Sequence, residues 1–188
     1  MQALGNDIIN WQVARCQTQK LRQRCLVKLF NSAELDYIHN HDSSILAFWH
    51  MWSIKETAYK AWQRLVKASP IFNPLAFHCQ MISDSECVVS IENLNFKVNS
   101  TLNSEFIYSS IISKENTISK VFDSKVLFED FTNQLDYYGW CFKKDNNGIP
   151  SLYSERRSTV LPISISHDQN WFAVQITKQI AEIIFEKA

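Results

Sequence analysis

The sequence predicts an α+β fold in which an antiparallel sheet packs against helices. Apolar residues in the first third of the chain recur at helical spacing, whereas the middle consists of short runs rich in β-branched and aromatic residues. A further helical stretch precedes the last apolar runs. This order suits antiparallel strands better than the regular alternation that builds a parallel sheet.

The length of the chain suits a single domain over residues 1–188, with a core that needs no disulfide or structural metal. Its five cysteines are scattered and are expected to be free thiols. Nineteen basic and nineteen acidic residues cancel, so no net field draws the chain to nucleic acid or to an anionic membrane. No apolar run approaches the roughly 20 residues of a membrane span. We expect a cytoplasmic protein with no nucleic acid and no membrane as partner.

The first elements are a short apolar strand over residues 3–10 and a polar, basic helix over residues 12–28. A second helix covers residues 32–40, because Asn31 and Ser32 carry side-chain oxygens that can accept hydrogen bonds from the first free amides.

The strongest periodic signal predicts a helix over residues 45–65. Apolar residues recur there at alternating spacings of three and four, which makes one buried face. They are Ala47, Met51, Ile54, Ala58, Ala61 and Leu65. Glu56 and Lys60 lie one turn apart and off this stripe, so they share a different face.

After Pro70 and Pro74 the residue pattern becomes typical of β-strands, and branched and aromatic residues predict a meander. Its strands cover residues 75–82, 86–91 and 106–112. Helical spacing returns afterwards, and the last strands flank two polar turns. These final elements are a helix over residues 124–138, strands over residues 140–144, 162–166 and 171–177, and a helix from Lys178.

Asp7 is an acidic residue in a strand otherwise suited to burial, so its carboxylate needs a partner. Magnesium could supply one, since it uses one or two protein carboxylates with phosphate oxygens and water. A solvated strand end or a capping aspartate is the other explanation.

Residues 52–60, WSIKETAYK, place the Glu56 carboxylate between the ammonium groups of Lys55 and Lys60. This arrangement could hold a metal beside a pyrophosphate. The alternative is a surface Glu56–Lys60 pair, which contributes only about 0.3–0.5 kcal/mol.

A third candidate is the strand that ends in Ser166 and His167. A histidine there can bind phosphate when charged or relay a proton when neutral, or it can be purely structural. Adjacent strand residues point to opposite faces, which argues against Ser166 and His167 as a nucleophile and its base.

Together, Gly5-Asn6-Asp7, residues 52–60 and Ser164-Ile165-Ser166-His167 resemble the motifs of the 4'-phosphopantetheinyl transferase superfamily. These are Gly-x-Asp on a strand, Trp/Phe-x-x-Lys-Glu-x-x-x-Lys on a helix, and Ser-x-Ser-His. The resemblance implies a magnesium-dependent transfer of phosphopantetheine from coenzyme A to a serine of an acyl or peptidyl carrier protein, with release of adenosine 3',5'-bisphosphate. The order of the motifs is that of the short holo-acyl-carrier-protein synthase type.

The chain is longer than that short type, which is a trimer with sites between subunits. We therefore expect two pseudo-symmetric halves, residues 1–120 and 121–188, that form both sides of the cleft as in surfactin-type enzymes. A monomer or pseudo-dimer is favoured over a trimer.

By the same resemblance, Asp7 and Glu56 would ligate magnesium, and Glu56 and Lys60 would be catalytic. Ile9 stands where surfactin-type members carry a third acidic ligand, so water would fill that position. The residues expected to bind coenzyme A are Lys55, Lys60, Ser166 and His167.

The carrier protein is expected to be acidic, and basic side chains near the amino end could bind it. They are Arg15, Arg22, Arg24 and Lys28. Two other functions are a catalytically inactive protein of the same fold that binds coenzyme A or a carrier protein, and an interaction module built on the meander. The presence of both Asp7 and Glu56 favours the enzyme.

Overall fold

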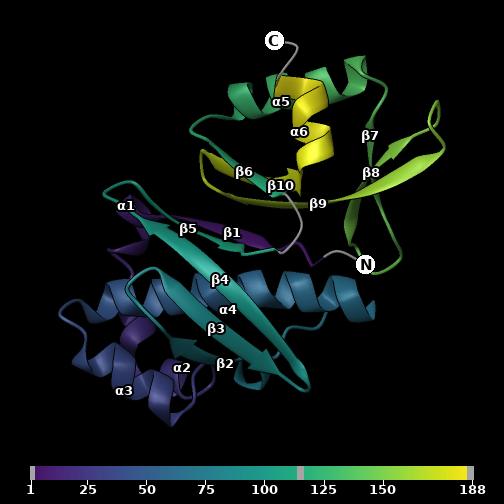
Figure 1. The fold of residues 1–188 in the computed structure, drawn as a ribbon. Helices are drawn as coiled ribbons and strands as arrows, with labels where there is room; N and C mark the ends of the chain where they lie inside the picture. Colours follow the sequence, from purple (N-terminus) through teal and green to yellow (C-terminus); the bar gives the residue numbers. More distant parts are fainter. Residues whose placement is uncertain (1–2, 114–116, 186–188) are drawn as a thin grey trace.

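The computed structural model describes residues 3–113 and 117–185 and contains two five-stranded sheets with helices packed on them (Figure 1). Every strand pairing in both sheets is antiparallel. The predicted α+β class is therefore confirmed. No helix within the described ranges is long and apolar enough to cross a membrane.

The first sheet has the strand order β1-β5-β4-β3-β2. Its strands are β1 (Asn6–Asn10), β2 (His78–Met81), β3 (Glu86–Ile91), β4 (Leu94–Leu102) and β5 (Phe106–Ile111). The helices of this half are α1 (Trp11–Ala14), η1 (Thr18–Leu21), α2 (Gln23–Leu26), α3 (Ser32–Asn40), α4 (Ser44–Val66) and η2 (Pro74–Ala76).

The second sheet repeats this arrangement, with the order β6-β10-β9-β8-β7. Its elements are β6 (Thr117–Phe122), α5 (Lys125–Tyr137), β7 (Cys141–Lys144), β8 (Pro150–Ser154), β9 (Thr159–Asp168), β10 (Trp171–Thr177) and α6 (Lys178–Phe185). In each half a strand and a long helix precede four more strands, and the first strand pairs with the last. Residue 120, at the expected division of the chain, lies inside β6.

The predicted helix over residues 45–65 is confirmed as α4, which packs against β1, β4 and β5. The Ser43 side chain accepts a hydrogen bond from the Leu46 amide at its start, and Lys67 ends it in the left-handed conformation. Five of the six stripe residues are at most 1% exposed, and Leu65 at the end is partly buried.

The basic helix predicted over residues 12–28 is wrong as a single element. The structure divides it into α1, η1 and α2, with extended backbone at Arg22 between the last two. Only Ala14 and Leu26 are buried in these three pieces. The segment therefore lacks the continuous apolar stripe whose burial stabilises most helices in proteins.

The meander contains a strand that the sequence analysis missed, β4. Along it, Phe96, Val98 and Ser100 are buried while the residues between them are exposed. This is the alternation of a half-buried strand, but the polar residues on both faces masked it. Strands β6 and β8 were also missed.

Candidate active site

Asp7 lies on β1, where its side chain points toward α4. Its neighbours Asn6 and Ile8 point to the other side and contact the second sheet, as alternation along a strand requires. The Lys60 ammonium lies 3.2 Å from Asp7 Oδ1 and donates to the Asn6 carbonyl oxygen at 2.8 Å. The structure thus joins two residues that are 53 positions apart.

Glu56 lies one turn before Lys60 on α4 and close to Asp7. Burial and the nearby Asp7 carboxylate raise the pKa of Glu56 to about 7, although Lys60 acts in the opposite direction. Burial also raises the pKa of Asp7, against the effect of Lys60. Within the described residues, no hydrogen bond or ion pair engages the Glu56 carboxylate. The Lys60 ammonium pairs with Asp7, so the Glu56 carboxylate adds uncompensated negative charge when it is ionised.

This pair of carboxylates fits a magnesium ion. Magnesium prefers oxygen ligands and is commonly bound through one or two carboxylates, with water and substrate phosphate completing its shell. In the described part of the chain, no group of three or more His, Cys, Asp or Glu side chains is placed to hold a metal. A cation at Asp7 and Glu56 would consequently need water or phosphate oxygens for its other positions.

Gly5 allows β1 to approach α4 closely. A Cβ atom at this position would lie 2.2 Å from the Thr57 carbonyl oxygen and 3.0 Å from the Ala61 amide nitrogen. Both contacts are with backbone atoms of a buried helix, so rotation of a neighbouring side chain cannot relieve them. The glycine of the Gly-x-Asp motif thus sets the distance between the strand of Asp7 and the helix of Glu56.

Replacement of Gly5 by alanine should displace β1 from α4. Overpacking of this kind usually costs about 1–3 kcal/mol of stability, and we expect a loss in that range on urea denaturation. Gly148→Ala is the control, since a Cβ there meets nothing within 4 Å although its positive φ of 77° is strained. A stable Gly5→Ala protein with an unchanged metal affinity would contradict this account of Gly5.

The raised pKa of Glu56 predicts a pH dependence of stability. The folded protein binds the Glu56 proton more tightly than the unfolded chain, where the pKa is near 4.5. The resulting stabilisation is fully present below about pH 4.5 and is lost as the pH rises through about 7. We expect this loss to be on the order of 1–3 kcal/mol in metal-free protein.

Urea denaturation of wild type and Glu56→Gln with a chelator present, at about pH 5 and about pH 8, measures this effect as the difference between the two proteins. The comparison is needed because His50, whose pKa burial lowers to about 4, changes stability in the opposite direction at acid pH. Parallel curves for the two proteins would show that Glu56 has an ordinary pKa.

A cleft of about 430 Å³ lies between α4, the turn at residues 145–148 and β9. Its lining includes Lys60, Arg64, Lys144 and His167, and none of the described residues that line it is acidic. The His167 ring stacks on Phe172, with the ring centroids 5.7 Å apart and the planes at 13°. The cleft therefore offers positive charge beside the Asp7–Glu56 pair, where a phosphate group could bind.

Ser166 is not among the residues that line this cleft. It is 5% exposed, and its Oγ accepts a hydrogen bond of 3.0 Å from Asn6 Nδ2. Ser166 and His167 point to opposite faces of β9, so only His167 faces the cleft. This geometry does not favour the expected contact of Ser166 with coenzyme A, which stays a prediction, because its hydroxyl group bonds to Asn6 on β1.

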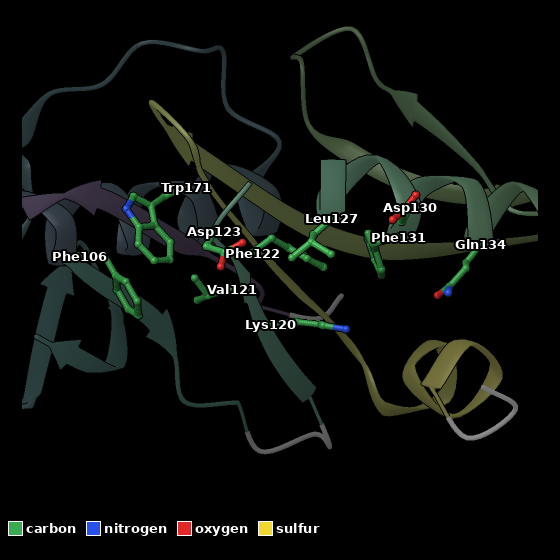
Figure 2. A pocket seen from close by; sticks show the side chains of 10 residues that line it. All are labelled: Phe106, Lys120, Val121, Phe122, Asp123, Leu127, Asp130, Phe131, Gln134 and Trp171. Atoms are coloured by element: carbon green, nitrogen blue, oxygen red, sulfur yellow. The ribbon is translucent and has the colours of Figure 1, made fainter. Parts of the chain in front are cut away.

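The second half does not repeat the Asp7–Glu56 pair. By strand order, β6 corresponds to β1 and α5 to α4, yet β6 is described over its whole length and contains no Asp or Glu. A separate cleft of about 550 Å³ lies there (Figure 2). Figure 2 shows Phe106 and Trp171 at one end of it and Asp130 and Gln134 of α5 at the other. The two halves share a topology, but β6 does not repeat the carboxylate that Asp7 provides on β1.

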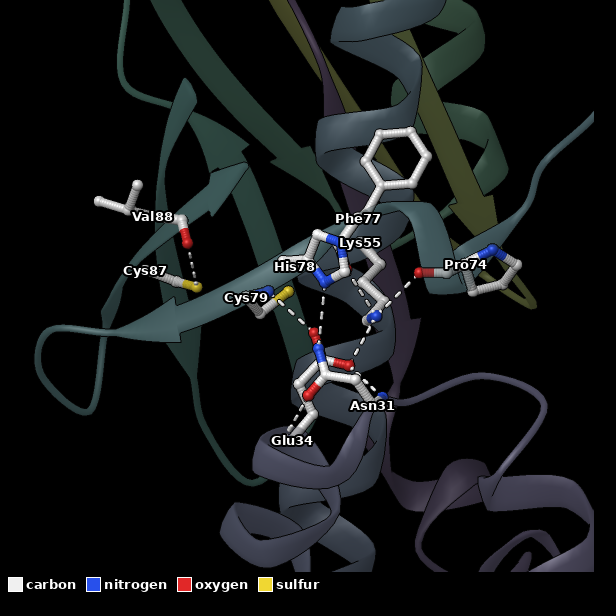
Figure 3. A network of polar contacts seen from close by, with 9 residues as sticks. All are labelled: Asn31, Glu34, Lys55, Pro74, Phe77, His78, Cys79, Cys87 and Val88. Carbon is white, nitrogen blue, oxygen red and sulfur yellow. Dashed lines mark hydrogen bonds and ion pairs between the residues drawn. The ribbon is translucent and has the colours of Figure 1, made fainter. Parts of the chain in front are cut away.

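Lys55 lies away from the cleft in a buried network (Figure 3). Its Nζ contacts Glu34 Oε2 at 2.8 Å and the carbonyl oxygens of Pro74 and Phe77 at 2.8 and 2.7 Å, and its side chain is 0% exposed. These three acceptors match the three donor hydrogens of an ammonium group. These contacts occupy the donors of Lys55 and do not favour the predicted contact with coenzyme A, which stays a prediction.

Asp168 and Arg64 were missed in the sequence analysis. Asp168 Oδ2 accepts a hydrogen bond of 2.8 Å from the Asn10 amide, and its charge acts on Asp7. Arg64 lines the cleft and donates to the Ile163 carbonyl oxygen. For Asp168 a signal was present, because it follows Ser164 and Ser166 at the two-residue spacing that places side chains on one face of a strand.

Comparison with known proteins gives one family match. The sequence model of the 4'-phosphopantetheinyl transferase superfamily matches residues 3–115, which is more than half of the chain and includes Asp7, Glu56 and Lys60. The match ends between β5 and β6, before the segment of His167. A comparison with individual curated proteins gives no match. The chain belongs to the 4'-phosphopantetheinyl transferase superfamily.

Proposed function

We propose that the protein transfers the 4'-phosphopantetheine arm of coenzyme A to a serine of an acyl or peptidyl carrier protein, with magnesium bound by Asp7 and Glu56. One observation carries the proposal. The two carboxylates and the Lys60 ammonium meet beside a cleft whose charged lining residues are all basic. Membership of the superfamily supports a phosphopantetheinyl transfer in general.

In the proposed reaction, the hydroxyl oxygen of the carrier serine forms a bond to the phosphorus that carries the pantetheine arm. The bond from that phosphorus to the bridging oxygen of the pyrophosphate breaks, and adenosine 3',5'-bisphosphate leaves with the electron pair. The hydroxyl proton passes to the Glu56 carboxylate or to water. No nucleophile is needed from this chain, because the acceptor serine belongs to the carrier.

Each residue then has a defined task. The chemistry supplied by magnesium, when bound, is neutralisation of the pyrophosphate charge. Lys60, which lines the cleft, donates to a phosphate oxygen and offsets the charge that develops on the leaving group. His167 binds a second coenzyme A phosphate from the opposite wall. Since α4 and β9 of one chain supply both walls, we also propose that the active unit is a monomer.

Mass spectrometry tests the proposal directly. An apo carrier protein incubated with the purified chain, coenzyme A and magnesium should gain the mass of phosphopantetheine, and a chelator should prevent the gain. If several acidic carriers gain no mass while the chain still binds coenzyme A, the transferase proposal is wrong and the chain is an inactive coenzyme A-binding protein.

The carrier protein is proposed to dock on the basic segment that follows β1. Arg22 and Arg24 are exposed there, and the sequence contains no acidic residue between Asp7 and Glu34. Charge reversal of both arginines should lower the association rate with an acidic carrier about 10-fold and weaken its salt dependence. The Michaelis constant for coenzyme A should not change.

Stopped-flow association with a fluorescent carrier at several salt concentrations measures the effect. Charge reversal of Lys97 and Lys125 is a matched control, because both lysines are exposed and lie outside the basic segment. Equal rates for wild type and the Arg22→Glu/Arg24→Glu protein would place the docking surface elsewhere.

A further inference from the structure

The outer edge of β1 is held by side chains of the second half. One edge of this strand pairs with β5. At the other edge, the Gly5 amide donates to Gln175 Oε1 at 3.1 Å, the Asn6 amide to Ser164 Oγ at 3.1 Å, and the Asn10 amide to Asp168 Oδ2 at 2.8 Å. Side-chain oxygens thus stand where the backbone carbonyls of a neighbouring strand would otherwise be.

Two of these three acceptors, Ser164 and Asp168, come from one face of β9, which also carries Ser166. Ser164, Ser166 and Asp168 are spaced by two residues, and all three point toward β1, where Ser166 binds the Asn6 side chain. The two serine bonds are protected from water, since Ser164 and Ser166 are 2% and 5% exposed, whereas the Asp168 bond is partly buried. The Asp168 bond is charge-assisted, which makes it stronger than a bond between neutral groups.

The held amides flank Asp7 on both sides along β1. Glu56 is fixed on a helix that the core holds firmly, whereas Asp7 lies on a strand at the edge of its sheet. The separation of the two carboxylates therefore depends on where this edge strand lies. A fit between one cation and two ligands is sensitive to small shifts in ligand position.

We propose that Ser164 and Asp168 are positioning residues, whose side-chain oxygens hold β1 so that Asp7 and Glu56 can bind one divalent cation together. The inference rests on the proposed function and deepens it. It gives the Ser-x-Ser-His-Asp stretch two separate tasks, because His167 faces the cleft while the residues on either side of it hold the metal-binding strand.

The test compares pairs of variants that remove or keep the acceptor oxygen. Asp168→Ala and Ser164→Ala remove it, whereas Asp168→Asn and Ser164→Thr keep it. Ser151→Ala, which removes a hydroxyl group on β8 that bonds to the Lys143 carbonyl oxygen, is the matched control. Manganese affinity in the presence of coenzyme A, followed by electron paramagnetic resonance, gives a readout that does not depend on turnover.

Loss of the acceptor should weaken manganese binding and lower kcat about 10–100-fold, the usual effect of removing a group that orients a metal ligand. The Michaelis constant for the carrier should stay unchanged, and Ser164→Thr and Ser151→Ala should behave like wild type. Asp168→Asn, which keeps the oxygen and loses the charge, should lose less manganese affinity than Asp168→Ala. If Asp168→Ala does not fold, the Ser164 pair decides alone.

Alanine variants that lose thermal stability but keep the manganese affinity of wild type would overturn the proposal, as would an Asp168→Asn protein as weak as Asp168→Ala. Failure of the proposed function has a different signature. A wild-type chain that modifies no carrier, yet binds manganese in a manner that depends on Ser164 and Asp168, would refute the transferase and keep the positioning role.

Discussion

Replacement of Glu56 by glutamine is expected to lower the rate of phosphopantetheine transfer more than about 100-fold, since loss of a group that merely orients a metal ligand already costs about 10–100-fold. The stability of the folded protein should not decrease. Glu56 is partly buried beside Asp7, and the repulsion between the two carboxylates ends when one becomes neutral. At neutral pH the metal-free variant should be at least as stable as wild type, so that activity and stability change in opposite directions.

Initial rates of carrier modification, together with urea denaturation of the same preparations, measure both effects. Glu129→Gln serves as the control, because Glu129 is an exposed carboxylate on α5 that pairs with the exposed Lys125. A Glu56→Gln enzyme with a rate within about 10-fold of wild type would mean that Asp7 and Glu56 are not the metal ligands.

Replacement of Lys55 by methionine should lower the free energy of unfolding by about 3–5 kcal/mol, the usual cost of leaving one member of a buried ion pair without its partner. Glu34 would remain 1% exposed, with the amides of Asn31 and Cys79 bound to its oxygens. Figure 3 shows that Glu34 joins α3, α4 and the start of β2 through these contacts. The damage should spread through all three elements.

Urea denaturation measures the loss, and two further variants help to interpret it. Lys125→Met removes an exposed pair and should change stability by less than about 0.5 kcal/mol. Combining Lys55→Met with Glu34→Gln removes the uncompensated charge and should recover part of the loss. A Lys55→Met protein of normal stability that binds coenzyme A poorly would return Lys55 to the substrate site.

The elements with a buried stripe or a defined cap could be predicted from the sequence. The α4 stripe is one, and the start of α3 is another, where Asn31 and Glu34 form a reciprocal pair of side-chain hydrogen bonds. Strand β4 could not be found in the same way. Ser100 occupies a buried position on it and bonds to Ser109 of β5, so the inner face is not uniformly apolar.

At the site, too, contacts between residues close in sequence could be predicted, and contacts between distant segments could not. Glu56 and Lys60 are four residues apart on a helix, so their shared face follows from the helical period. Lys55 is adjacent to Glu56 in sequence but turned about 100° around the helix axis. Its direction into the core could not be predicted, because its partner Glu34 lies on a different helix.

The hydrogen bonds across the outer edge of β1 also limit how the chain can be shortened. The superfamily match ends at residue 115, which suggests that the first half could be expressed alone. Such a truncated chain would lose Ser164, Asp168 and Gln175, and the amides that they bind would become an unprotected strand edge. Open edges of this kind pair with other chains and promote aggregation. By covering the outer edge of β1, the second half therefore prevents that edge from pairing with another chain, and it also supplies one wall of the cleft.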